Sequence, residues 1–441
     1  MAHLPETSQT IPGRAAVAVI GAGYVGLTTA VCLAHLGHTV SCGERDHSKV
    51  ERLSRGVSTI VEDGLSEMLG EGLDSGRLRF VETAALAVKG AEFVFICVPT
   101  PERVDGSADV TALESVSREI GPHLSCGAVV VNKSTVPIGS TALVERLLGR
   151  DDVSVLSNPE FLREGSGISD SLRPSRVVIG GSDMDAAARL AKLVGSSGAR
   201  VVVTTAATAE MIKYASNAFL AMKLSFVNAS ANVCEALGAN VEDMLLGIGY
   251  DDRIGFDYLT PGPGWGGSCL PKDTRALAFM AREAGVSFPL LEEAIRSNEA
   301  QMDSIVDKVR STVGGSFAGT LIGAWGLTFK AGTDDRRKSP AMEILSRIVA
   351  QGGSVQAFDP TTVDVNVPEL PSGIAVLNDA YSVCQGADAL VVLTEWDEFR
   401  SLDLEKVHSL MAEPRVIDAR NILDAALVHS LGFVYVGMGR P

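Results

Sequence analysis

A glycine-rich turn near the start of the chain restricts the possible folds more than any other feature. Residues 21–26 read Gly-Ala-Gly-Tyr-Val-Gly and directly follow an apolar run at residues 15–20. Residues 27–36 then have helical composition and end at Gly37. In this order of strand, turn and helix, the glycines permit a tight turn and let a pyrophosphate approach the N-terminus of the helix. The sequence therefore predicts the first βαβ unit of a dinucleotide-binding α/β domain.

A carboxylate follows at the place where such a domain binds the ribose of its ligand. Residues 39–43 are predicted to form the second strand, which leads directly into Glu44. This is the acidic position that follows the turn by roughly twenty residues in dinucleotide-binding domains. The carboxylate would bind the ribose hydroxyls and repel a 2′-phosphate, so it favours NAD over NADP. The neighbouring Arg45 argues for the opposite preference.

Five further apolar runs indicate that the sheet continues beyond these two strands. They lie at residues 92–98, 128–132, 153–156, 177–180 and 201–204. Helical or loop segments alternate with them, as in a doubly wound sheet, whose ligands bind at the carboxyl ends of the strands. Polar loops follow three of the runs, at residues 98–101, 134–137 and 158–165. Each could be an ordinary loop, but three together predict the rim of an active site.

Residues 206–237 are predicted to form one long helix, because they contain neither proline nor glycine. Lys213 and Asn217 are four positions apart and therefore share a face of this helix. On such an apolar segment Lys213 is either a functional residue or a surface lysine whose stem covers its neighbours. A long apolar helix that joins two α/β domains is also suited to be the contact between two copies of the chain.

The stretch at residues 262–273 is the strongest candidate for chemistry, and it reads Gly-Pro-Gly-Trp-Gly-Gly-Ser-Cys-Leu-Pro-Lys-Asp. Its glycines allow close approach to a ligand, and Pro271 is typical of the first turn of a helix. Cys269 would lie near the positive end of the helix dipole and close to Lys272, and both features favour the thiolate. Asp273 adds a carboxylate that could bind a water or a proton. The alternative is a tight turn that contains a buried cysteine.

A second α/β unit is predicted after about residue 313. Its strands are expected at residues 320–324, 354–358, 389–393 and 415–417, with a helix from Pro340. This half has no Gly-x-Gly-x-x-Gly turn. The loop after its first strand instead carries Lys330, Arg336 and Arg337, and such cations suit a diphosphate. The alternative is a solvated, charged loop.

Composition argues against several other classes of protein. The 441 residues carry a net charge of −16 without a basic cluster, which argues against nucleic acid as a partner. No apolar run has the length and purity of a membrane span, and the first residues do not resemble a signal peptide. Seven scattered cysteines indicate a reducing cytoplasm. Neither they nor the seven histidines have the spacing of metal ligands, so we expect no metal.

The predicted fold class is α/β, with two Rossmann-like, doubly wound domains joined by the long central helix. We expect a flexible N-terminal tail at residues 1–14 and a NAD-binding Rossmann domain at 15–205. A central helical domain, which would mediate dimerisation, is expected at 206–313, and a second Rossmann-like domain at 314–441.

Six motifs together resemble those of the UDP-glucose/GDP-mannose dehydrogenase family, in the family's order and over residues 15–423. They are Gly-Ala-Gly-Tyr-Val-Gly-Leu at 21–27, Lys-Ser-Thr-Val-Pro at 133–137, Asn-Pro-Glu-Phe-Leu-Arg-Glu-Gly at 158–165, Lys-Tyr-Ala-Ser-Asn-Ala-Phe-Leu-Ala at 213–221, Gly-Gly-Ser-Cys-Leu-Pro-Lys-Asp at 266–273 and Phe-Lys-Ala-Gly-Thr-Asp-Asp at 329–335. The motif at 158–165 is most similar to the branch of the family that oxidises UDP-glucose.

The resemblance implies a four-electron oxidation of a nucleotide sugar. The expected reaction converts the C6 alcohol of UDP-glucose to the carboxylate of UDP-glucuronate in two NAD-dependent steps, for polysaccharide biosynthesis. Cys269 would hold the aldehyde as a thiohemiacetal and then as a thioester, which water hydrolyses. The alternatives are the same chemistry on GDP-mannose or a UDP-N-acetylhexosamine, a non-catalytic nucleotide-sugar-binding protein, and a two-electron dehydrogenase of the hydroxyacid type. The last would need neither Cys269 nor the C-terminal half.

The resemblance also assigns roles by position. Catalysis would use Cys269, Lys213, Asp273, Asn217, Glu160 and Thr135. In this scheme Lys213 and Asn217 stabilise oxyanions at C6, Asp273 handles the water or proton of the first oxidation, and Glu160 activates the hydrolytic water oriented by Thr135. The cofactor contacts would be Gly21, Gly23, Tyr24, Val25, Gly26, Glu44, Lys49, Thr100, Thr135, Glu164, Lys272 and Arg337. The UDP-sugar contacts would be Glu160, Phe161, Leu162, Arg163, Lys213, Asn217, Arg253, Tyr258, Leu259, Gly266, Lys330 and Arg420.

Overall fold

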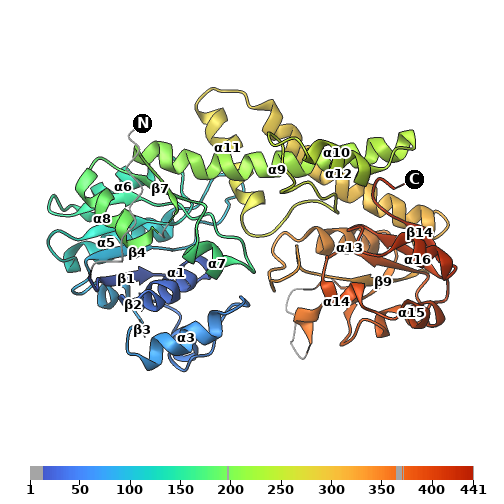
Figure 1. Ribbon diagram of the computed structural model, residues 1–441, viewed down its shortest axis with the longest axis horizontal. Coiled ribbons are helices and arrows are strands. Elements are labelled where there is room, and N and C mark those ends of the chain that lie inside the picture. The colour runs from blue at the N-terminus through green and yellow to red at the C-terminus, as the bar shows by residue number, and fades with distance from the viewer. Residues whose placement is uncertain (1–12, 196–197, 364–369, 371, 441) are drawn as a thin grey trace. The chain divides into compact units, whose positions relative to one another are not determined.

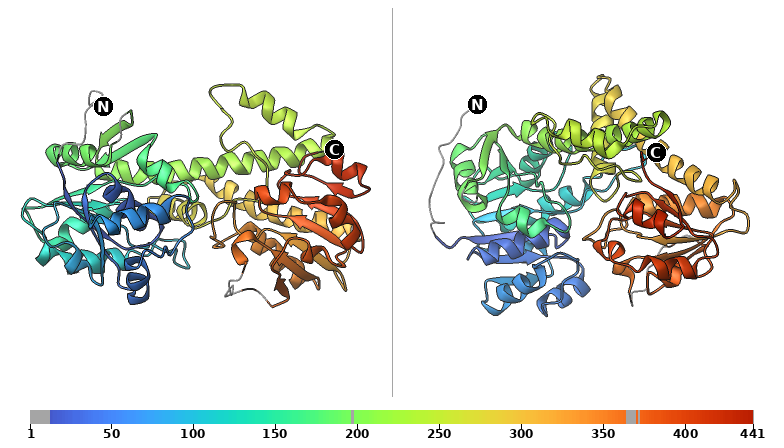
Figure 2. Two further views of the ribbon diagram at one scale, coloured as in Figure 1. Left: turned by 60° about the horizontal axis from the view of Figure 1, so that its bottom comes forward. Right: turned by 45° about the vertical axis from the view of Figure 1, so that its right-hand side comes forward.

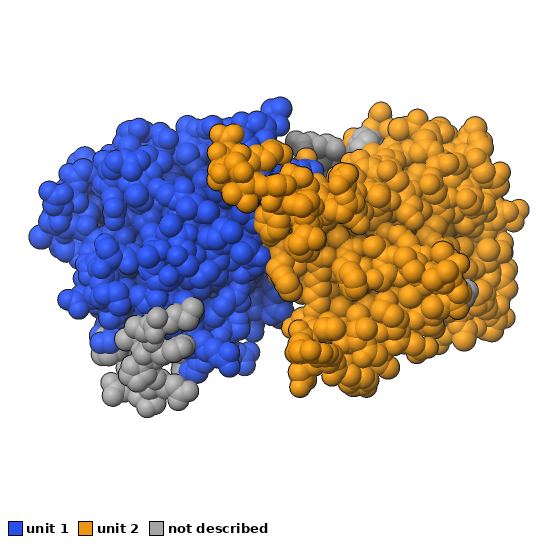
Figure 3. Space-filling view, turned by 90° about the horizontal axis from the view of Figure 1, so that it is seen from above, with its two compact units in different colours: residues 1–216, 275–280 blue, residues 217–274, 281–441 orange. Residues whose placement is uncertain are grey.

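A computed structural model describes residues 13–195, 198–363, 370 and 372–440 of the chain. Residues 1–12 of the expected N-terminal tail lie outside the described residues. The chain divides into two compact units, coloured separately in Figure 3. Unit 1 comprises residues 1–216 and 275–280, and unit 2 comprises residues 217–274 and 281–441. Each unit contains one of the two predicted sheets.

The sheet of unit 1 has eight strands in the order β3-β2-β1-β4-β5-β6-β7-β8. The strands are β1 Ala16–Ile20, β2 Thr39–Gly43, β3 Leu78–Val81, β4 Phe93–Ile96, β5 Val129–Asn132, β6 Ser154–Ser157, β7 Arg176–Gly180 and β8 Arg200–Thr204. The pairs are parallel except at β6 and β7, which meet antiparallel at Ser157 and Gly180. All seven predicted strands are present with bounds shifted by at most two residues. The four-residue β3 was not predicted, because only Leu78, Phe80 and Val81 are apolar.

Helices cover both faces of this sheet, so the domain is doubly wound (Figure 1). The helices of unit 1 before α9 are α1 Tyr24–His35, α2 His47–Ser54, α3 Leu65–Asp74, α4 Ala84–Ala87, α5 Thr111–Ile120, α6 Ser140–Leu148, α7 Gly167–Leu172 and α8 Met184–Val194, with a 3₁₀ turn at Gly121–His123. One apolar core lies between the sheet and α1, α2, α3 and α8. The other lies between the sheet and α4, α5 and α6. The strands are buried on both faces, which explains why they read as continuous apolar runs.

The sheet of unit 2 repeats the same strand order, β11-β10-β9-β12-β13-β14, and all its pairs are parallel. Its strands are β9 Leu321–Trp325, β10 Ser354–Phe358, β11 Ile374–Val376, β12 Ala389–Val392, β13 Arg415–Asp418 and β14 Val434–Val436. The edge strands β11 and β14 were not predicted, since three residues are too short to show a pattern. The helices after β9 are α13 Pro340–Ala350, α14 Asp397–Arg400, α15 Leu404–Leu410 and α16 Ala425–Ser430, with 3₁₀ turns at Pro360–Thr362 and Ser382–Cys384.

The first turn of each sheet is built in the same way. Gly21 after β1 has a φ of 96°, and its N–H donates to the Gly43 carbonyl oxygen at 2.8 Å. Gly326 after β9 has a φ of 98°, and its N–H donates to the Phe358 carbonyl oxygen at 2.7 Å. Both angles are ones that only glycine adopts without strain. The second half is therefore a Rossmann-like domain, although its turn lacks the other two glycines.

Four helices lie between the two sheets along the chain: α9 Ala206–Leu237, α10 Val241–Gly249, α11 Leu270–Glu283 and α12 Pro289–Thr312. The bounds of α9 are those predicted from its lack of proline and glycine, and Figure 2 shows it as one uninterrupted helix. It starts in unit 1 and continues into unit 2. No helix in the described ranges is long and apolar enough to cross a membrane.

Candidate active site

The glycine turn of unit 1 fits the pyrophosphate of a dinucleotide. A Cβ at Gly26 would lie 1.8 Å from the carbonyl oxygen of Gly21, so this position accepts only glycine. A Cβ at Gly23 would meet no atom of the described chain within 4 Å, which leaves that side of the turn open. The helix α1 begins at the next residue without a side-chain cap and without an acidic residue in its first turn. Its unpaired N–H groups are suited to bind an anion.

Glu44 lies at this turn, as its spacing predicted. Its Oε2 accepts the Ala22 N–H at 3.0 Å, and its Oε1 accepts the Asp46 N–H at 3.0 Å. These bonds fix the carboxylate beside the glycine turn, where a ribose would lie. Asp46 caps the N-terminus of α2, the helix that carries Lys49. The residues present therefore fit an NAD-type dinucleotide.

A buried ion pair lies at the carboxyl ends of the strands of unit 1. The Lys213 ammonium from α9 donates to Glu160 Oε1 at 2.8 Å, and the two residues are only 3% and 6% exposed. The Leu162 N–H donates to the other carboxylate oxygen at 2.6 Å. The interpretation of Lys213 as a surface lysine is therefore wrong.

The pKa of Glu160 reflects two opposing effects. Burial alone would raise it, but the charge of Lys213 and the hydrogen bonds from Lys213 and Leu162 outweigh burial and hold the pKa below its usual range. Glu160 is thus an ionised carboxylate whose partner is a cation, an arrangement suited to activating a water molecule. The ring of Phe161 stacks against the Arg176 guanidinium at 3.8 Å and lies 5.5 Å from Lys213 Nζ.

Two of the three predicted rim loops are joined by a hydrogen bond. The Thr100 hydroxyl donates to the Thr135 carbonyl oxygen at 2.6 Å. Lys133, at the end of β5, donates from its ammonium to Asn158 Oδ1 at 3.1 Å, just before the motif that contains Glu160. Burial lowers the pKa of Lys133, while the nearby Cys97 and Glu160 act against that shift. The third loop is therefore tied to the second.

A second buried polar group lies in unit 2. Asp273, in the first turn of α11 and 1% exposed, accepts the Asn217 amide at 2.6 Å and the Lys272 ammonium at 2.5 Å. Its own N–H donates to the Cys269 carbonyl oxygen at 3.0 Å, so the thiol lies one helical turn before the carboxylate. The Cys269 sulfur is half-buried and lies 3.6 Å from the Ser268 hydroxyl. Lys213 precedes Asn217 by one turn of the same helix, α9.

Side chains that had no predicted role hold the stretch before Cys269 in place. Asn298 of α12 accepts the Trp265 N–H at 2.8 Å and donates to the Trp265 carbonyl oxygen at 3.0 Å. Asn228 and Gln301 bind Gly262 from α9 and α12 at 2.9 Å each. The Trp265 indole donates to Ser225 at 2.9 Å. Polar residues at core positions of two helices were the only sequence signal for this set.

Asn298→Ala is expected to lower stability by roughly 2–4 kcal/mol, because it leaves two buried backbone groups of Trp265 without partners. The apparent melting temperature should fall by several degrees, as measured by thermal denaturation. Asn240→Ala, which removes the solvent-exposed N-cap of α10, is a control with an expected loss of about 1 kcal/mol. Equal losses in the two variants would contradict the anchoring role of Asn298.

The cationic residues predicted to bind a diphosphate (Lys330, Arg336 and Arg337) or the UDP-sugar (Arg420) are held in different ways. Arg420 donates to the carbonyl oxygens of Leu393 at 2.9 Å and Phe329 at 2.8 Å, across the first turn of the second sheet. Arg336 donates to the Thr361 hydroxyl at 2.8 Å. Arg337 forms a bidentate pair with Asp335, and Lys330 Nζ lies 5.8 Å from the Phe329 ring. Arg336 and Arg337, in the loop after β9, are therefore both held by hydrogen bonds to other side chains of unit 2.

The other residues predicted to contact the UDP-sugar either form ion pairs with nearby residues or lie where the backbone or the packing is constrained. Arg163 pairs with Asp170, and Arg253 pairs with Asp251. Tyr258 has a φ of 61°, which is unusual for a side chain with a Cβ, and Leu259 is buried. A Cβ at Gly266 would lie 2.2 Å from the Lys338 carbonyl oxygen. Among the described residues, no group of His, Cys, Asp and Glu could hold a metal ion.

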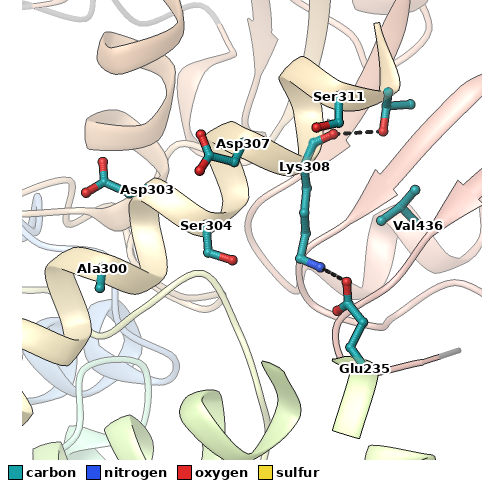
Figure 4. Close-up of a pocket in the computed structure, with 9 residues that line it drawn as sticks. Glu235, Ala300, Asp303, Ser304, Asp307, Lys308, Ser311 and Val436 are labelled. Carbon is teal, nitrogen blue, oxygen red and sulfur yellow. Dashed lines mark hydrogen bonds and ion pairs between the residues drawn. The ribbon is translucent and has the colours of Figure 1, made fainter. Parts of the chain in front are cut away.

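A pocket of about 570 Å³ in unit 2 contains none of these predicted residues (Figure 4). It is lined by Glu235, Ala300, Asp303, Ser304, Asp307, Lys308, Ser311, Thr312 and Val436. Lys308 is already paired with Glu235 inside it. Apart from Thr135, the residues with predicted catalytic roles lie instead in the two buried polar groups, Glu160 and Lys213 in unit 1 and Asn217, Cys269 and Asp273 in unit 2.

The fold and the glycine turn define an NAD-binding protein with two Rossmann-type domains. Models of three domains of one family match the chain. The NAD binding domain matches residues 15–195, the central domain 207–300 and the UDP binding domain 323–425. The chain therefore belongs to the UDP-glucose/GDP-mannose dehydrogenase family, as the six motifs predicted.

Relatives of known name span nearly the whole chain. The UDP-glucose 6-dehydrogenase of Rhizobium meliloti (strain 1021) is 42% identical over 96% of this chain and 99% of that protein. The UDP-glucose 6-dehydrogenase of Bacillus subtilis (strain 168) is 41% identical over 96% and 93%. Among solved structures, a UDP-glucose dehydrogenase from Pyrobaculum islandicum has a TM-score of 0.89 and 34% identity over 100% of both chains. A UDP-D-ManNAc dehydrogenase from Pyrococcus horikoshii has a TM-score of 0.84 and 30% identity over 96% of this chain and 99% of that chain.

Proposed function

We propose that this chain oxidises the C6 alcohol of UDP-glucose to the carboxylate of UDP-glucuronate with two molecules of NAD. One observation carries the proposal. A half-buried thiol, Cys269, lies one helical turn from the buried Asp273–Asn217 pair, and Lys213 lies one turn of α9 from Asn217. Nucleophile, carboxylate, amide and ammonium are the groups that a covalent oxidation of an alcohol to an acid requires.

The roles follow from the chemistry of each group. Asp273 takes the hydroxyl proton through a bound water in the first oxidation, while Lys213 and Asn217 stabilise the negative charge that develops on the C6 oxygen. The Cys269 thiolate then adds to the aldehyde and forms a thiohemiacetal, which the second oxidation converts to a thioester. Glu160, with Thr135, activates the water that hydrolyses the thioester and releases the thiol. Bound NAD would accept the hydride in each oxidation.

The proposed binding residues divide by part of the chain. We propose residues 15–205 as the NAD-binding domain, 206–313 as the central domain and 314–441 as the UDP-sugar domain, after a tail at 1–14. NAD would be held by the glycine turn, Glu44 and Lys49, with the further contacts Tyr24, Val25, Thr100, Glu164, Lys272 and Arg337. The UDP-sugar would be held by Phe161, Leu162, Arg163, Arg253, Tyr258, Leu259, Gly266, Lys330 and Arg420.

The deciding experiment measures NADH formed per sugar on a panel of UDP-glucose, GDP-mannose, UDP-N-acetylglucosamine and UDP-N-acetylmannosamine. Two NADH per UDP-glucose are expected, with no activity on the other sugars. Activity on UDP-N-acetylmannosamine alone would favour the second candidate, which the likeness to the Pyrococcus horikoshii structure supports. One NADH per sugar would contradict the covalent role of Cys269.

Lys330→Ala is expected to raise the KM for UDP-glucose about tenfold and to change kcat by less than about threefold, because an ion pair with a phosphate is a binding contact. Steady-state kinetics at saturating NAD measure both constants. Lys406→Ala is the matched control, since Lys406 lies over the Tyr381 ring on the surface of the same unit. An unchanged KM in Lys330→Ala would remove this lysine from the substrate site.

The exposed face of α9 supports the proposal that the protein forms a homodimer. Phe219, Phe226 and Val233 are 65%, 61% and 56% exposed, and they recur every seven residues. This spacing places them on one stripe of the helix, the pattern that packs against a second helix. The same stripe on a second copy is the natural partner, because a two-fold interface is self-complementary. The seven free cysteines favour a cytoplasmic location for this dimer.

Phe226→Asp is expected to convert the dimer to monomers, because it introduces a charge at the centre of the stripe. Light scattering after size-exclusion chromatography measures the mass of the particle. Val104→Asp is the control, since Val104 is fully exposed in a loop of unit 1. A dimer that persists in Phe226→Asp would place the subunit contact elsewhere.

A further inference from the structure

Glu62 is a buried carboxylate to which no role has been assigned. It lies just before α3 and is only 8% exposed. Three segments of unit 1 reach its two oxygens. The Tyr24 hydroxyl lies 2.5 Å and the Gly165 N–H nitrogen 2.8 Å from Oε2, and the Ile168 N–H nitrogen lies 3.5 Å from Oε1. A buried carboxylate that accepts donors from distant segments holds those segments in one arrangement.

Two of the three segments belong to parts of unit 1 that the proposed function uses, and the third follows directly after one of them. Tyr24 is the first residue of α1 and lies inside the glycine turn. Gly165 ends the motif that contains Glu160 and Glu164. Ile168 is in the first turn of α7. Glu62 comes from a loop 103 residues before Gly165 in the chain, so only the fold brings them together.

The loop at residues 163–168 has one internal backbone hydrogen bond, from the Ser166 N–H to the Arg163 carbonyl oxygen at 2.9 Å, and side chains bind several of its other backbone groups. The Arg163 carbonyl oxygen accepts the Tyr24 hydroxyl at 2.9 Å, and the Arg163 N–H donates to Asp170 at 2.9 Å. The Gly165 and Ile168 N–H groups donate to Glu62. A Cβ at Gly167 would lie 2.5 Å from the Tyr24 hydroxyl oxygen, so α7 packs directly on this tyrosine.

Burial and the contact with Glu62 act together on the protonation of Tyr24. Burial, followed by the hydrogen bond and the negative charge of Glu62, raises the pKa of Tyr24 well above its usual range. The hydroxyl therefore keeps its one proton, which is shared between Glu62 Oε2 at 2.5 Å and the Arg163 carbonyl oxygen at 2.9 Å. Loss of the Glu62 acceptor would leave the Gly165 N–H without its partner and free the hydroxyl to turn away.

We propose that Glu62 is a positioning residue that ties the glycine turn of the cofactor site to the loop from Glu160 to Gly165. It touches neither substrate nor reacting atoms and acts through Tyr24 and Gly165. The inference rests on the proposed function for the roles of Tyr24, Glu160 and Glu164. It adds that NAD affinity and the order of this loop depend on one carboxylate from outside both motifs.

The test compares Glu62→Gln with Glu67→Gln, which changes an exposed glutamate on the neighbouring α3. The Glu62→Gln substitution keeps the shape of the side chain but leaves a single acceptor oxygen and removes the charge. The new NH2 group must face either the Ile168 N–H, on the side of Oε1, or the Gly165 N–H and Tyr24 hydroxyl, on the side of Oε2. In enzyme without ligands, amide exchange is expected to be about tenfold faster at Gly165 or Ile168, whichever amide loses its acceptor. The Kd for NAD, measured by calorimetry, is expected to rise about tenfold. Glu67→Gln should match the wild type in both measurements.

Tyr24→Phe provides a second variant that removes only the hydroxyl. It should weaken NAD binding in part, and the double variant with Glu62→Gln should lose less than the sum of the two single effects. Exchange at Gly165 and Ile168 within twofold of wild type in Glu62→Gln would overturn the proposal, and so would an unchanged Kd for NAD. Both measurements are made without sugar. Failure of the proposed function, seen as no turnover of UDP-glucose by the wild type, would therefore be recognised separately.

Discussion

Cys269→Ala is expected to form no UDP-glucuronate, a loss on the order of 10⁴-fold or more, comparable to removal of other covalent nucleophiles. Without the thiol, the aldehyde cannot be captured as a thiohemiacetal, so the second oxidation lacks its substrate. The first oxidation needs only Asp273, Lys213 and Asn217, and it should still give one NADH per sugar at low yield. Mass spectrometry of the product and NADH absorbance measure the two steps separately.

Cys126→Ala is the matched control for this variant, because Cys126 is the exposed cysteine of the chain and lies in unit 1. It should keep full activity. Glu160→Gln tests the hydrolysis of the thioester, because without the proposed base the thioester should accumulate on Cys269. Intact-mass spectra during turnover would then show enzyme heavier by the UDP-glucuronyl adduct. Two NADH per sugar from Cys269→Ala would contradict the covalent mechanism.

Lys213→Met is expected to destabilise the protein at neutral pH by about 3–5 kcal/mol and to abolish activity. The substitution leaves the Glu160 carboxylate buried without its cation, and breaking one side of a buried ion pair is costly. It also removes the charge that would stabilise the oxyanion at C6. Chemical denaturation and UDP-glucose turnover measure the two effects. Lys192→Met, on the neighbouring helix α8, is a control for loss of a lysine.

The pH dependence of stability separates this effect from simple loss of packing. In the wild type the pKa of Glu160 is held below its usual range, so the pair contributes stability that is present at neutral pH and lost as the pH falls through that lowered pKa. In Lys213→Met the Leu162 hydrogen bond and the charge of Lys133 remain, but burial is the largest effect and should now raise the pKa of Glu160. The folded state is then most stable when this carboxyl group is protonated. The stability difference between the two proteins should therefore shrink from pH 7 toward pH 4. A difference that stays constant over this range would contradict the charge argument.

The double variant Lys213→Met/Glu160→Leu extends the same test. It removes both charges and replaces them with apolar side chains, which is often close to neutral for a buried pair. Stability should recover by a large part of the single-variant loss, while activity should stay absent. Recovery of activity would show that neither residue takes part in the reaction.

The sequence by itself determined the class of fold and the positions of the chemical groups. The glycine turn, the bounds of α9 and most strands follow from short-range patterns, because turn geometry and helix or strand periodicity are written in neighbouring residues. The motif around Cys269 also follows from local sequence, since its glycines and Pro271 prepare the start of α11. Three-residue edge strands such as β11 are too short to carry such a pattern.

Only the tertiary structure decided which groups meet. Glu160 pairs with Lys213, which is 53 residues away in the sequence, and Asn217 binds Asp273, which is 56 residues away. Glu62 accepts a hydrogen bond from Gly165, which is 103 residues away in the sequence. These pairings depend on the order of strands in the sheet and on burial, which makes an unpartnered charge or N–H group costly. The sequence shows which residues are polar. The fold excludes water from some of them, and these residues then need one another as hydrogen-bond or ion-pair partners.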